Sequence, residues 1–465
     1  MAYTVNQSTT GVQGAADDLI YVVEDSPLSG TINYRYVCVV LLGAVEVIKL
    51  KQLPNNQNAA VFNIQSIAKN YVYQDDNPYS LGVTGLDGTP ATTKIFATNE
   101  NAIKTFTVRF GYEYSATAED SPAETLFPAE DVEVICINGN LLLPVEVSPD
   151  SSVATSYKLT SPTKRFLSDI EPSLAKGSNV WNTSILYDTG KFQRAALSFL
   201  NGDDVGSTGS NYLHVSYFNG STALNTAYFT NTTTQGGKAP AASLTDGQSL
   251  LYVGVGTFNL ENQAISAVLK PTDVGNTNWT HYYVQMSSGV TLAGATSVAY
   301  KFERVSCGKY IQDDQVYSLH WWNSKGGVDN LPLLGKVKES QDMSRQTYRT
   351  SGGNSLEADG TTYPYAKYSW EGGKRGTRVQ TTTSYELSTI GGDVDSLTPL
   401  IRSLMNSERV FLSGASLFGG NAARLGSGLV QCVVKDSKVE YLSGVNDQSM
   451  SYKLNIEVSR RRANP

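Results

Sequence analysis

Along much of this chain, apolar and polar residues alternate with a period of two, which is the pattern of β-strands that bury one face. The alternation is clearest over 104–114, and two denser apolar runs, 34–42 and 45–50, are separated by a Gly-Ala pair. The two runs predict a β-hairpin. A second hairpin is predicted over 132–143, because its central Asn-Gly pair is the strongest short-range signal for a two-residue turn.

Two stretches place their apolar residues at helical spacing instead. The first, 62–71, predicts a short helix with an apolar side. The second, near 396–407, follows the capping residues Asp395 and Ser396 and carries an early Pro399. This second stretch predicts a helix that packs one face against a sheet. The apolar positions are Ile64, Ile67 and Tyr71 in the first stretch and Leu397, Leu400, Ile401, Leu404 and Met405 in the second.

These patterns predict a mainly β protein that consists of several β-sandwich domains with one or two short packed helices. Residues 1–18 are polar and aperiodic, and we expect them to form a flexible N-terminal arm, either free or laced onto a neighbour. An N-terminal β domain is expected over 19–175. Short strands between Gly, Asn, Thr and Ser turns predict an inserted β-sandwich over 176–300. A C-terminal β domain with the second helix is expected over 301–465.

Composition agrees with a β protein made for polar contacts. The chain has 40% hydrophobic and only 17% charged residues, with 27 Tyr against 14 Phe. Tyr favours strands, and its ring and hydroxyl suit contacts between chains. The net charge is −7, so the chain lacks the excess of Lys and Arg that sequence-independent nucleic-acid binding needs. No specific nucleic-acid partner is therefore expected.

The chain is expected to stay soluble, without membrane insertion. Its N-terminus has no positive patch followed by an apolar core, so no signal peptide is predicted. No apolar run approaches the roughly 18 residues that a spanning helix needs. The four cysteines are spread without paired spacing, and those in apolar runs are predicted to be buried, reduced thiols. They are Cys38, Cys136, Cys307 and Cys432.

No catalytic, cofactor-binding or metal-binding constellation stands out. The three histidines, His214, His281 and His320, have no second ligand at metal-binding spacing, and we expect them to be hydrogen-bonded or packed on aromatic rings. Adjacent carboxylates on a strand point to opposite faces, so the Asp-Asp pairs predict surface turns, with a weak divalent-cation site as the alternative. The pairs begin at Asp17, Asp75, Asp203 and Asp313.

A sugar-stacking platform is the one recognition site that the sequence suggests. Trp279, Tyr282 and Tyr283, together with Trp181 and Tyr217, could present aromatic faces to a host-surface glycan. Core packing of the same side chains is the competing interpretation and the favoured one, because nothing in the sequence places them on one exposed face.

Two parts of the chain resemble virion proteins of tailed bacteriophages, of the type that infects marine bacteria and Bacteroidota. In the first part, 305–330, a Cys-Gly-Lys-Tyr start leads into an aromatic strand and then into Asn-x-x-Gly-Gly at 323–327. The second part runs from the predicted C-terminal helix to Val458. Further segments that fit the resemblance are 53–56, 62–64, 165–169, 331–335 and 338–349. The match over 176–300 is loose, and this is where a specialised insert would lie.

The resemblance implies a structural protein of the tail tip or baseplate. Such a distal-tail or adaptor-like protein would assemble in the host cytoplasm, form a ring with copies of itself, and connect the tail tube to fibres in the virion. The N-terminal arm and the run Arg460–Arg462 would then be straps between subunits.

Two other functions are weighed against this one. The first is a receptor-binding fibre or adhesin that recognises host-surface glycans through the middle β domain. The second is a glycan-cleaving enzyme, which would need two carboxylates facing one groove. Since no spacing in the sequence indicates such a pair, the chain is not expected to be an enzyme and no cofactor is expected.

Overall fold

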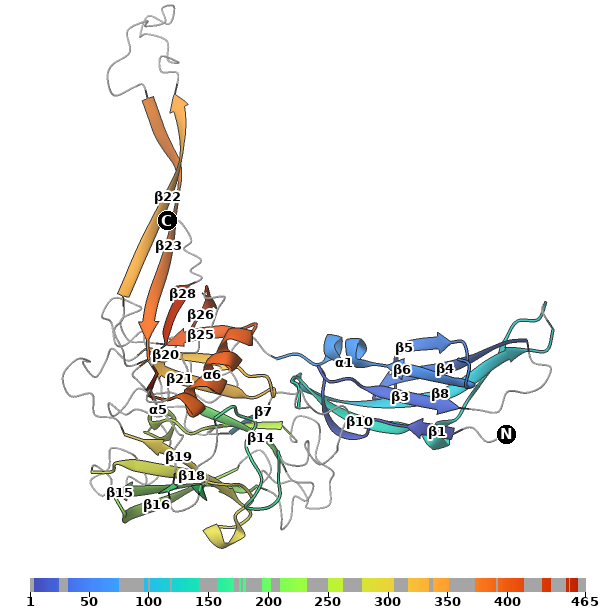
Figure 1. The fold of residues 1–465 in the computed structure, drawn as a ribbon, viewed down its shortest axis with the longest axis horizontal. Coiled ribbons are helices and arrows are strands. Elements are labelled where there is room, and N and C mark those ends of the chain that lie inside the picture. Colours follow the sequence, from blue (N-terminus) through green and yellow to red (C-terminus); the bar gives the residue numbers. More distant parts are fainter. Residues whose placement is uncertain are drawn as a thin grey trace, which may run out of the picture.

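The structure is a computed structural model of the 465-residue chain. Its sheets form two bodies, a sandwich near the N-terminus and a larger body made by the rest of the chain, from which a two-stranded ribbon projects (Figure 1). The residues that the structure describes are 4–24, 32–74, 96–98, 101–117, 119–141, 157–170, 175–176, 179–180, 195–201, 210–231, 250–261, 278–304, 317–333, 338–350, 373–389, 392–413, 429–435, 449–450 and 452–458.

The N-terminal sandwich packs a three-stranded sheet against a six-stranded one. In the smaller sheet the order is β1 (Thr4–Gln7), β3 (Ile20–Glu24), β6 (Ala59–Asn63). In the larger sheet the order is β2 (Gly11–Gly14), β10 (Val132–Ile137), β8 (Ile103–Ser115), β4 (Ile32–Leu42), β5 (Val45–Gln52), with β9 (Ala123–Leu126) also paired to β8. Helix α1 (Gln65–Tyr71) and the 3₁₀ turn η1 (Pro128–Glu130) complete it.

Two four-stranded sheets form the middle of the chain. One has the order β11 (Lys158–Leu159), β14 (Ala196–Asn201), β17 (Leu250–Gly254), β7 (Phe96–Thr98). The other has the order β16 (Thr222–Thr230), β15 (Tyr212–Asn219), β18 (His281–Ser287), β19 (Tyr300–Glu303). The short elements here are β12 (Ala175–Lys176), β13 (Asn179–Val180), α5 (Thr257–Glu261) and η3 (Leu292–Gly294).

A seven-stranded sheet dominates the C-terminal part. Its order is β21 (Val328–Leu333), β20 (Tyr317–Trp322), β25 (Val410–Ser413), β26 (Leu429–Val434), β28 (Lys453–Val458), β23 (Gly373–Ser388), β22 (Lys338–Thr350). Helix α6 (Val394–Asn406) packs against it, and the indole of Trp321 in β20 donates a hydrogen bond to Ser403 in the helix, 3.0 Å away. Strands β24 (Gly392–Asp393) and β27 (Ser449–Met450) pair beside the helix.

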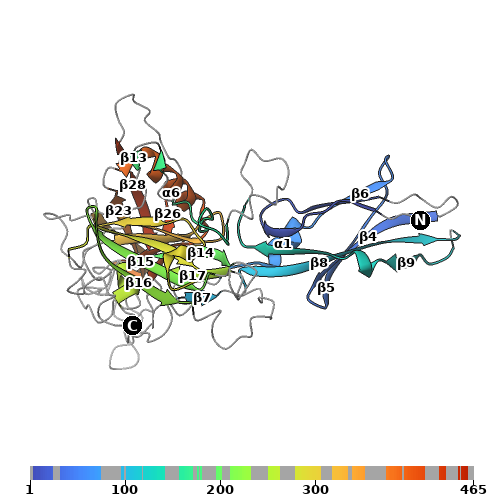
Figure 2. The same ribbon diagram turned by 90° about the horizontal axis from the view of Figure 1, so that it is seen from below.

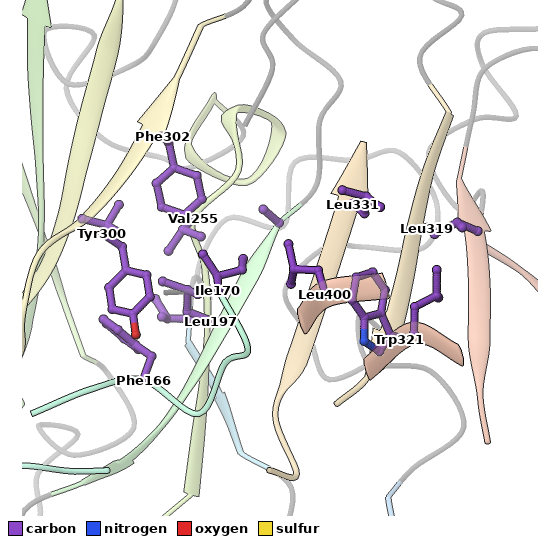
Figure 3. Close-up of a cluster of buried hydrophobic side chains, with 14 of the residues drawn as sticks. Phe166, Ile170, Leu197, Val255, Tyr300, Phe302, Leu319, Trp321, Leu331 and Leu400 are labelled. Carbon is purple, nitrogen blue, oxygen red and sulfur yellow. The ribbon is translucent and has the colours of Figure 1, made fainter. Parts of the chain in front are cut away.

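One apolar core runs through the middle and the C-terminal sheets. It extends from Leu197 and Tyr300 on the middle sheets, with Phe166 packed beside them, to Trp321 and Leu400 on the C-terminal part (Figure 3). The sandwich has a core of its own, and a smaller cluster, which includes Ile103, Tyr252 and Trp322, lies where the sandwich meets the larger body. The boundary predicted near residue 300 stays a prediction, but the apolar packing is continuous across it.

The prediction of a mainly β fold with several sheets is confirmed. The hairpin of 34–50 is β4 paired with β5, and its turn has Gly43 at φ +62°, a backbone conformation that glycine adopts without steric cost. Both predicted helices are present as α1 and α6. Buried residues of α1 are Ile67 and Ala68, whereas Tyr71 is 39% exposed.

The structure corrects three details of the predicted elements. Helix α6 begins at Val394, so Asp395 and Ser396 are not its caps and Pro399 lies inside it. Residues 4–7 and 11–14 are strands of the sandwich rather than parts of an arm. They lack an apolar stripe, so only their pairing with β3 and β10 makes them visible as strands.

The third correction concerns the turn at Asn138 and Gly139. A two-residue hairpin turn of the Asn-Gly kind requires positive φ at both positions, and neither residue has it. Strand β10 pairs instead with β8 in antiparallel orientation and with β2 in parallel orientation. Residues 142–143 of the predicted hairpin lie outside the described part of the chain, as do Cys307, Trp181 and Arg460–Arg462.

Candidate functional site

The turn that joins β20 to β21 is the centre of the candidate site. It consists of the residues Asn-Ser-Lys-Gly-Gly at 323–327. The side-chain oxygen of Asn323 accepts hydrogen bonds from the backbone N–H groups of Lys325, at 3.0 Å, and Gly327, at 2.8 Å. An Asn side chain that bonds the backbone two residues ahead builds the turn from within. This accounts for the Asn of the Asn-x-x-Gly-Gly motif.

Both glycines of the motif are required by close backbone contacts. Gly326 has φ +80°, and a Cβ atom there would collide with the carbonyl oxygen of Asn138 in the sandwich. A Cβ atom on Gly327 would collide with the carbonyl oxygen of Leu167. Since neither backbone segment can yield as a flexible side chain would, the turn fits its neighbours only with glycine at both positions.

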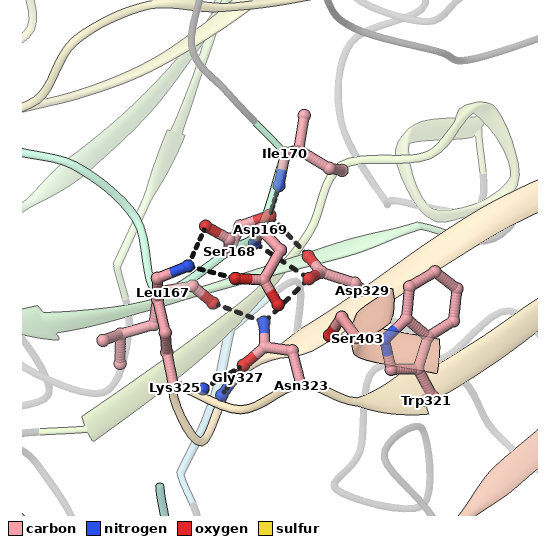
Figure 4. Close-up of polar contacts among 10 residues, drawn as sticks. All are labelled: Leu167, Ser168, Asp169, Ile170, Trp321, Asn323, Lys325, Gly327, Asp329 and Ser403. Carbon is pink, nitrogen blue, oxygen red and sulfur yellow. Dashed lines mark hydrogen bonds and ion pairs between the residues drawn. The ribbon is translucent and has the colours of Figure 1, made fainter. Parts of the chain in front are cut away.

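A buried carboxylate, that of Asp329 in β21, fixes the turn to the 167–170 segment. It is fully buried, and one of its oxygens accepts a hydrogen bond from the hydroxyl of Ser168. The other oxygen accepts from the backbone N–H of Asp169 and from the side-chain amide of Asn323, both at 2.9 Å (Figure 4). The same amide donates to the carbonyl of Leu167 at 2.9 Å.

We refer to Leu167–Asp169, Asn323–Gly327 and Asp329 together as the clasp. Lys325 contributes its only cation: the ammonium group forms an ion pair with Asp169 and donates to the carbonyl of Ser168 at 3.3 Å. One cation therefore faces two carboxylates. Burial, and then the charge of Asp169, raise the pKa of Asp329 to about 6. Burial alone would lower the pKa of Lys325, but the nearby Asp169 gives a net rise.

The clasp also holds the sandwich. The backbone N–H of Asn140 donates to the carbonyl of Ser324 at 2.6 Å, and the side-chain amide of Gln74 donates to the carbonyl of Gly326 at 2.7 Å. The guanidinium group of Arg409, which precedes β25, donates to the carbonyl of Gln74 at 3.1 Å. The sandwich, the middle sheets and the C-terminal sheet thus meet at one turn.

A cavity of about 350 Å³ lies beside this meeting point. Among its lining residues, Gln74 and Trp322 are buried, and neither the side-chain oxygen of Gln74 nor the indole N–H of Trp322 has a hydrogen-bond partner among the described residues. An unpaired buried acceptor and donor in a polar cavity are the groups that an ordered water would bridge. We therefore interpret this cavity as part of the junction.

The chemistry of the clasp is that of a structural lock. No solvent reaches Asp329, so its carboxylate is not accessible to a substrate. All of its hydrogen bonds are to groups of the chain, and buried polar groups that are fully paired define a unique packing. The Asn-x-x-Gly-Gly and 165–169 segments are visible in the sequence, but their contact is not, because 160 residues separate Asp169 from Asp329.

The predicted sugar platform does not form on one face. Trp279 and Tyr282 are buried in the main core, and the hydroxyl of Tyr282 donates to the carbonyl of Val255 at 2.8 Å. Tyr217 is also buried and packs against both rings. Core packing, the competing interpretation, describes these three side chains. Because Trp279 and Tyr282 are buried, neither ring is accessible to a sugar.

Tyr283 points to the opposite face of β18, as a neighbour on a strand must. There it contacts the rings of Phe218 and His281, which stack on each other with an interplanar angle of 6°. All three side chains are partly exposed. Phe218, His281 and Tyr283 form a small aromatic face, which the sequence did not reveal because its members come from two strands. Burial lowers the pKa of His281 and raises that of Tyr283.

The remaining candidate residues have structural roles. His214 and His320 are buried, and a ring nitrogen of His214 lies 3.1 Å from the carbonyl of Gly289. In the first Asp-Asp pair, Asp18 is exposed, as in a surface turn, but Asp17 is buried and accepts hydrogen bonds from the backbone N–H groups of Gly14 and Leu141. The other three Asp-Asp pairs lie outside the described residues.

Three cysteines are buried and free, as predicted, and burial raises each thiol pKa to about 12. They are Cys38, Cys136 and Cys432. Within the described ranges, no group of three His, Cys, Asp or Glu residues could hold a metal ion. No helix among those residues is long and apolar enough to cross a membrane.

No family model matches the chain, and the search of curated proteins finds no match.

Proposed function

We propose that this chain is a structural component of a tailed-phage virion, most specifically a tail-tip or baseplate protein that assembles with copies of itself as a ring and connects the tail tube to fibres. The observation that carries the proposal is the combination of a locked junction with a projecting ribbon. The clasp holds the sandwich on the larger body, while β22 and β23 extend away from that body (Figure 1). Such a shape suits a part that bridges neighbours.

The placement of the recognised segments supports the same proposal. The Asn-x-x-Gly-Gly motif and the 165–169 segment, which both belong to the resemblance to phage virion proteins, meet in the clasp. The residues of both segments form hydrogen bonds within the chain, as residues of structural motifs do. The virion role itself rests on the resemblance.

Immunogold electron microscopy tests the proposal. Antibodies raised against the purified protein would be applied to virus particles from cultures that produce the chain. Label at the end of tails that is removed by pre-incubation with the free protein is the expected result. Absence of the protein from purified particles, measured by mass spectrometry of the same fraction, would contradict it.

The aromatic face favours a second candidate function, an adhesin that binds host-surface glycans. Partly exposed rings at Phe218, His281 and Tyr283 could stack on a sugar, whereas Trp279 and Tyr282 could not. Glycan-array binding by the whole chain that is lost in Tyr283→Ala and kept in Tyr73→Ala, a control at an exposed tyrosine of the sandwich, would support this function. Equal binding by both variants would exclude that face.

A further inference from the structure

The ribbon is highly exposed along its outer strand, β22. We define it as Lys338–Thr350 of β22 and the residues Gly373–Glu386 of β23 that pair with them. Every side chain from Lys338 to Tyr348 is exposed, including Met343 at 60% and Tyr348 at 47%. A two-stranded hairpin alone is at best marginally stable in water. This ribbon is about 40 Å long at the usual rise per residue. We therefore expect another surface to pack against it.

Both edges of the outer ribbon are open among the described residues. Strand β23 pairs with β28 only over Thr383–Ser388. Its outer part, residues 373–382, pairs with β22 alone among the described residues. The outer edge of β22 ends the seven-stranded sheet. Open edges with unpaired backbone groups are sites at which another chain adds to a sheet.

The outer half of the ribbon is basic. Residues 344–350 and 373–380 contain five cations and no acidic residue. The whole chain has a net charge of −7, so the remainder carries −7 − 5 = −12. A basic surface on an acidic protein is attracted to the acidic part of a second copy. The five cations are Arg345, Arg349, Lys374, Arg375 and Arg378.

A complementary acidic surface lies on the N-terminal sandwich. Residues 119–133, which include β9 and η1, contain six acidic residues and no cation. Two of the six are paired within the chain, Glu124 with Lys49 and Asp131 with Arg109. The other four have exposed side chains and form no ion pair among the described residues. They are Glu119, Asp120, Glu130 and Glu133.

Within one chain these two surfaces lie far from each other. In Figure 1 the ribbon rises from the larger body, whereas the sandwich extends away from that body in a different direction; Figure 2 shows the sandwich from below, to one side of the body. The clasp fixes the sandwich in this position. The acidic surface that the ribbon could reach therefore belongs to another molecule.

We propose that the ribbon of one copy docks on the acidic surface at 119–133 of the next copy. The contact joins two different surfaces, so repeating it closes a ring or extends a filament. This inference rests on the proposed function only in requiring self-assembly, and it names the interface that the ring would use.

Light scattering and sedimentation of the full-length protein, over a wide range of concentration and at low and high salt, test the inference. The ribbon variant carries Arg345→Glu and Lys374→Glu, and the acidic-surface variant carries Glu119→Lys and Asp120→Lys. A control variant, Lys69→Glu with Arg402→Glu, makes the same change of charge at exposed cations outside the ribbon. Thermal melting of each variant checks that its fold is intact.

The expected result is a concentration-dependent oligomer that high salt weakens. Each interface variant should lower the association constant by at least about tenfold, because like charges then face each other. The two sets of substitutions combined should restore much of the association, and the control should leave it unchanged.

Three results would overturn the inference. If the wild-type protein remains a monomer throughout, no such contact exists. If an oligomer forms and both interface variants retain it, copies assemble through another surface, and the proposed function survives while the inference fails. The third result needs a separate measurement, retention of each protein on double-stranded DNA. If the wild type is retained, and the ribbon variant is not retained but still forms the oligomer, the ribbon binds nucleic acid instead.

Discussion

The clasp and the ribbon use polar residues in opposite ways. In the clasp, Asp329, Ser168 and Asn323 are buried and their hydrogen bonds are made within the chain. In the ribbon, polar side chains such as Asp342 and Ser344 face solvent on a pair of strands that has little else to pack against. A buried polar group that loses its partner is costly, whereas an exposed one has water as a substitute. The clasp therefore belongs to the stability of the chain, and the ribbon to its contacts.

The largest expected effect is that of Asp329→Ala. It would leave the hydroxyl of Ser168, the backbone N–H of Asp169 and the amide of Asn323 without their acceptor. We expect a loss of about 4 kcal/mol in the free energy of unfolding, measured by denaturant titration. Asp342→Ala on the exposed ribbon is the matched control and should change it by less than about 0.5 kcal/mol. Equal effects of the two would contradict the comparison.

The second largest difference in stability between the clasp and the ribbon is expected from glycine substitutions. Gly327→Ala forces a methyl group against the carbonyl of Leu167, so we expect a loss of about 3 kcal/mol. Gly376→Ala, in the ribbon, meets no atom within 4 Å and should be close to neutral. Thermal unfolding of both proteins gives the difference directly. A tolerated Gly327→Ala would mean that the clasp is looser than its contacts indicate.

Stability should also depend on pH through Asp329. Its pKa is raised from 3.8 to about 6 in the folded protein, so the folded state binds more protons than the unfolded state between these values. Stability contributed by this group therefore falls as pH rises from about 4 to about 6. Denaturant titrations across this range would measure the slope.

Asp329→Asn sharpens that prediction. An Asn oxygen can accept from Asp169 and Asn323 while its amide donates to the Ser168 hydroxyl, so the geometry of the clasp is kept and one buried negative charge is removed. The variant should be at least as stable as the wild type at pH 7 and should lose the slope between pH 4 and 6. An unchanged slope would show that another group titrates there.

The smallest effect on the single chain is expected in the ribbon. Met343→Thr removes an exposed apolar side chain and should change the free energy of unfolding of the monomer by less than about 0.5 kcal/mol. The same substitution should weaken association, since Met343 would be covered in the docked state. Light scattering of this variant beside Val433→Thr, a control at another apolar side chain that is 60% exposed, separates the two effects.

Local periodicity was sufficient to predict much of the fold. The alternating stretch at 104–114 is β8 (Ile103–Ser115), and the helical stripe near 396–407 buries Leu400, Ile401 and Leu404. Strands β1 and β2 could not be found in this way, because their four residues each carry no apolar stripe and pairing alone defines them. Their recognition requires the tertiary structure.

The candidate site shows the same limit. Asn323 and the two glycines after it were visible as a motif, but Asp329 and Ser168 meet only in three dimensions. One part of the sugar platform could have been excluded from the sequence, since Tyr282 and Tyr283 are adjacent on a strand and must face opposite sides of the sheet. The structure places Tyr282 in the core and Tyr283 on the outer face.

Amide hydrogen exchange at low and at high protein concentration distinguishes a clasp that locks the chain internally from a ribbon that contacts another copy. The account predicts that amides at 323–329 are protected in both samples, whereas those of the outer ribbon, 344–350, exchange rapidly in the dilute sample and slowly in the concentrated one. Equal exchange of the ribbon amides at both concentrations would contradict a contact between copies.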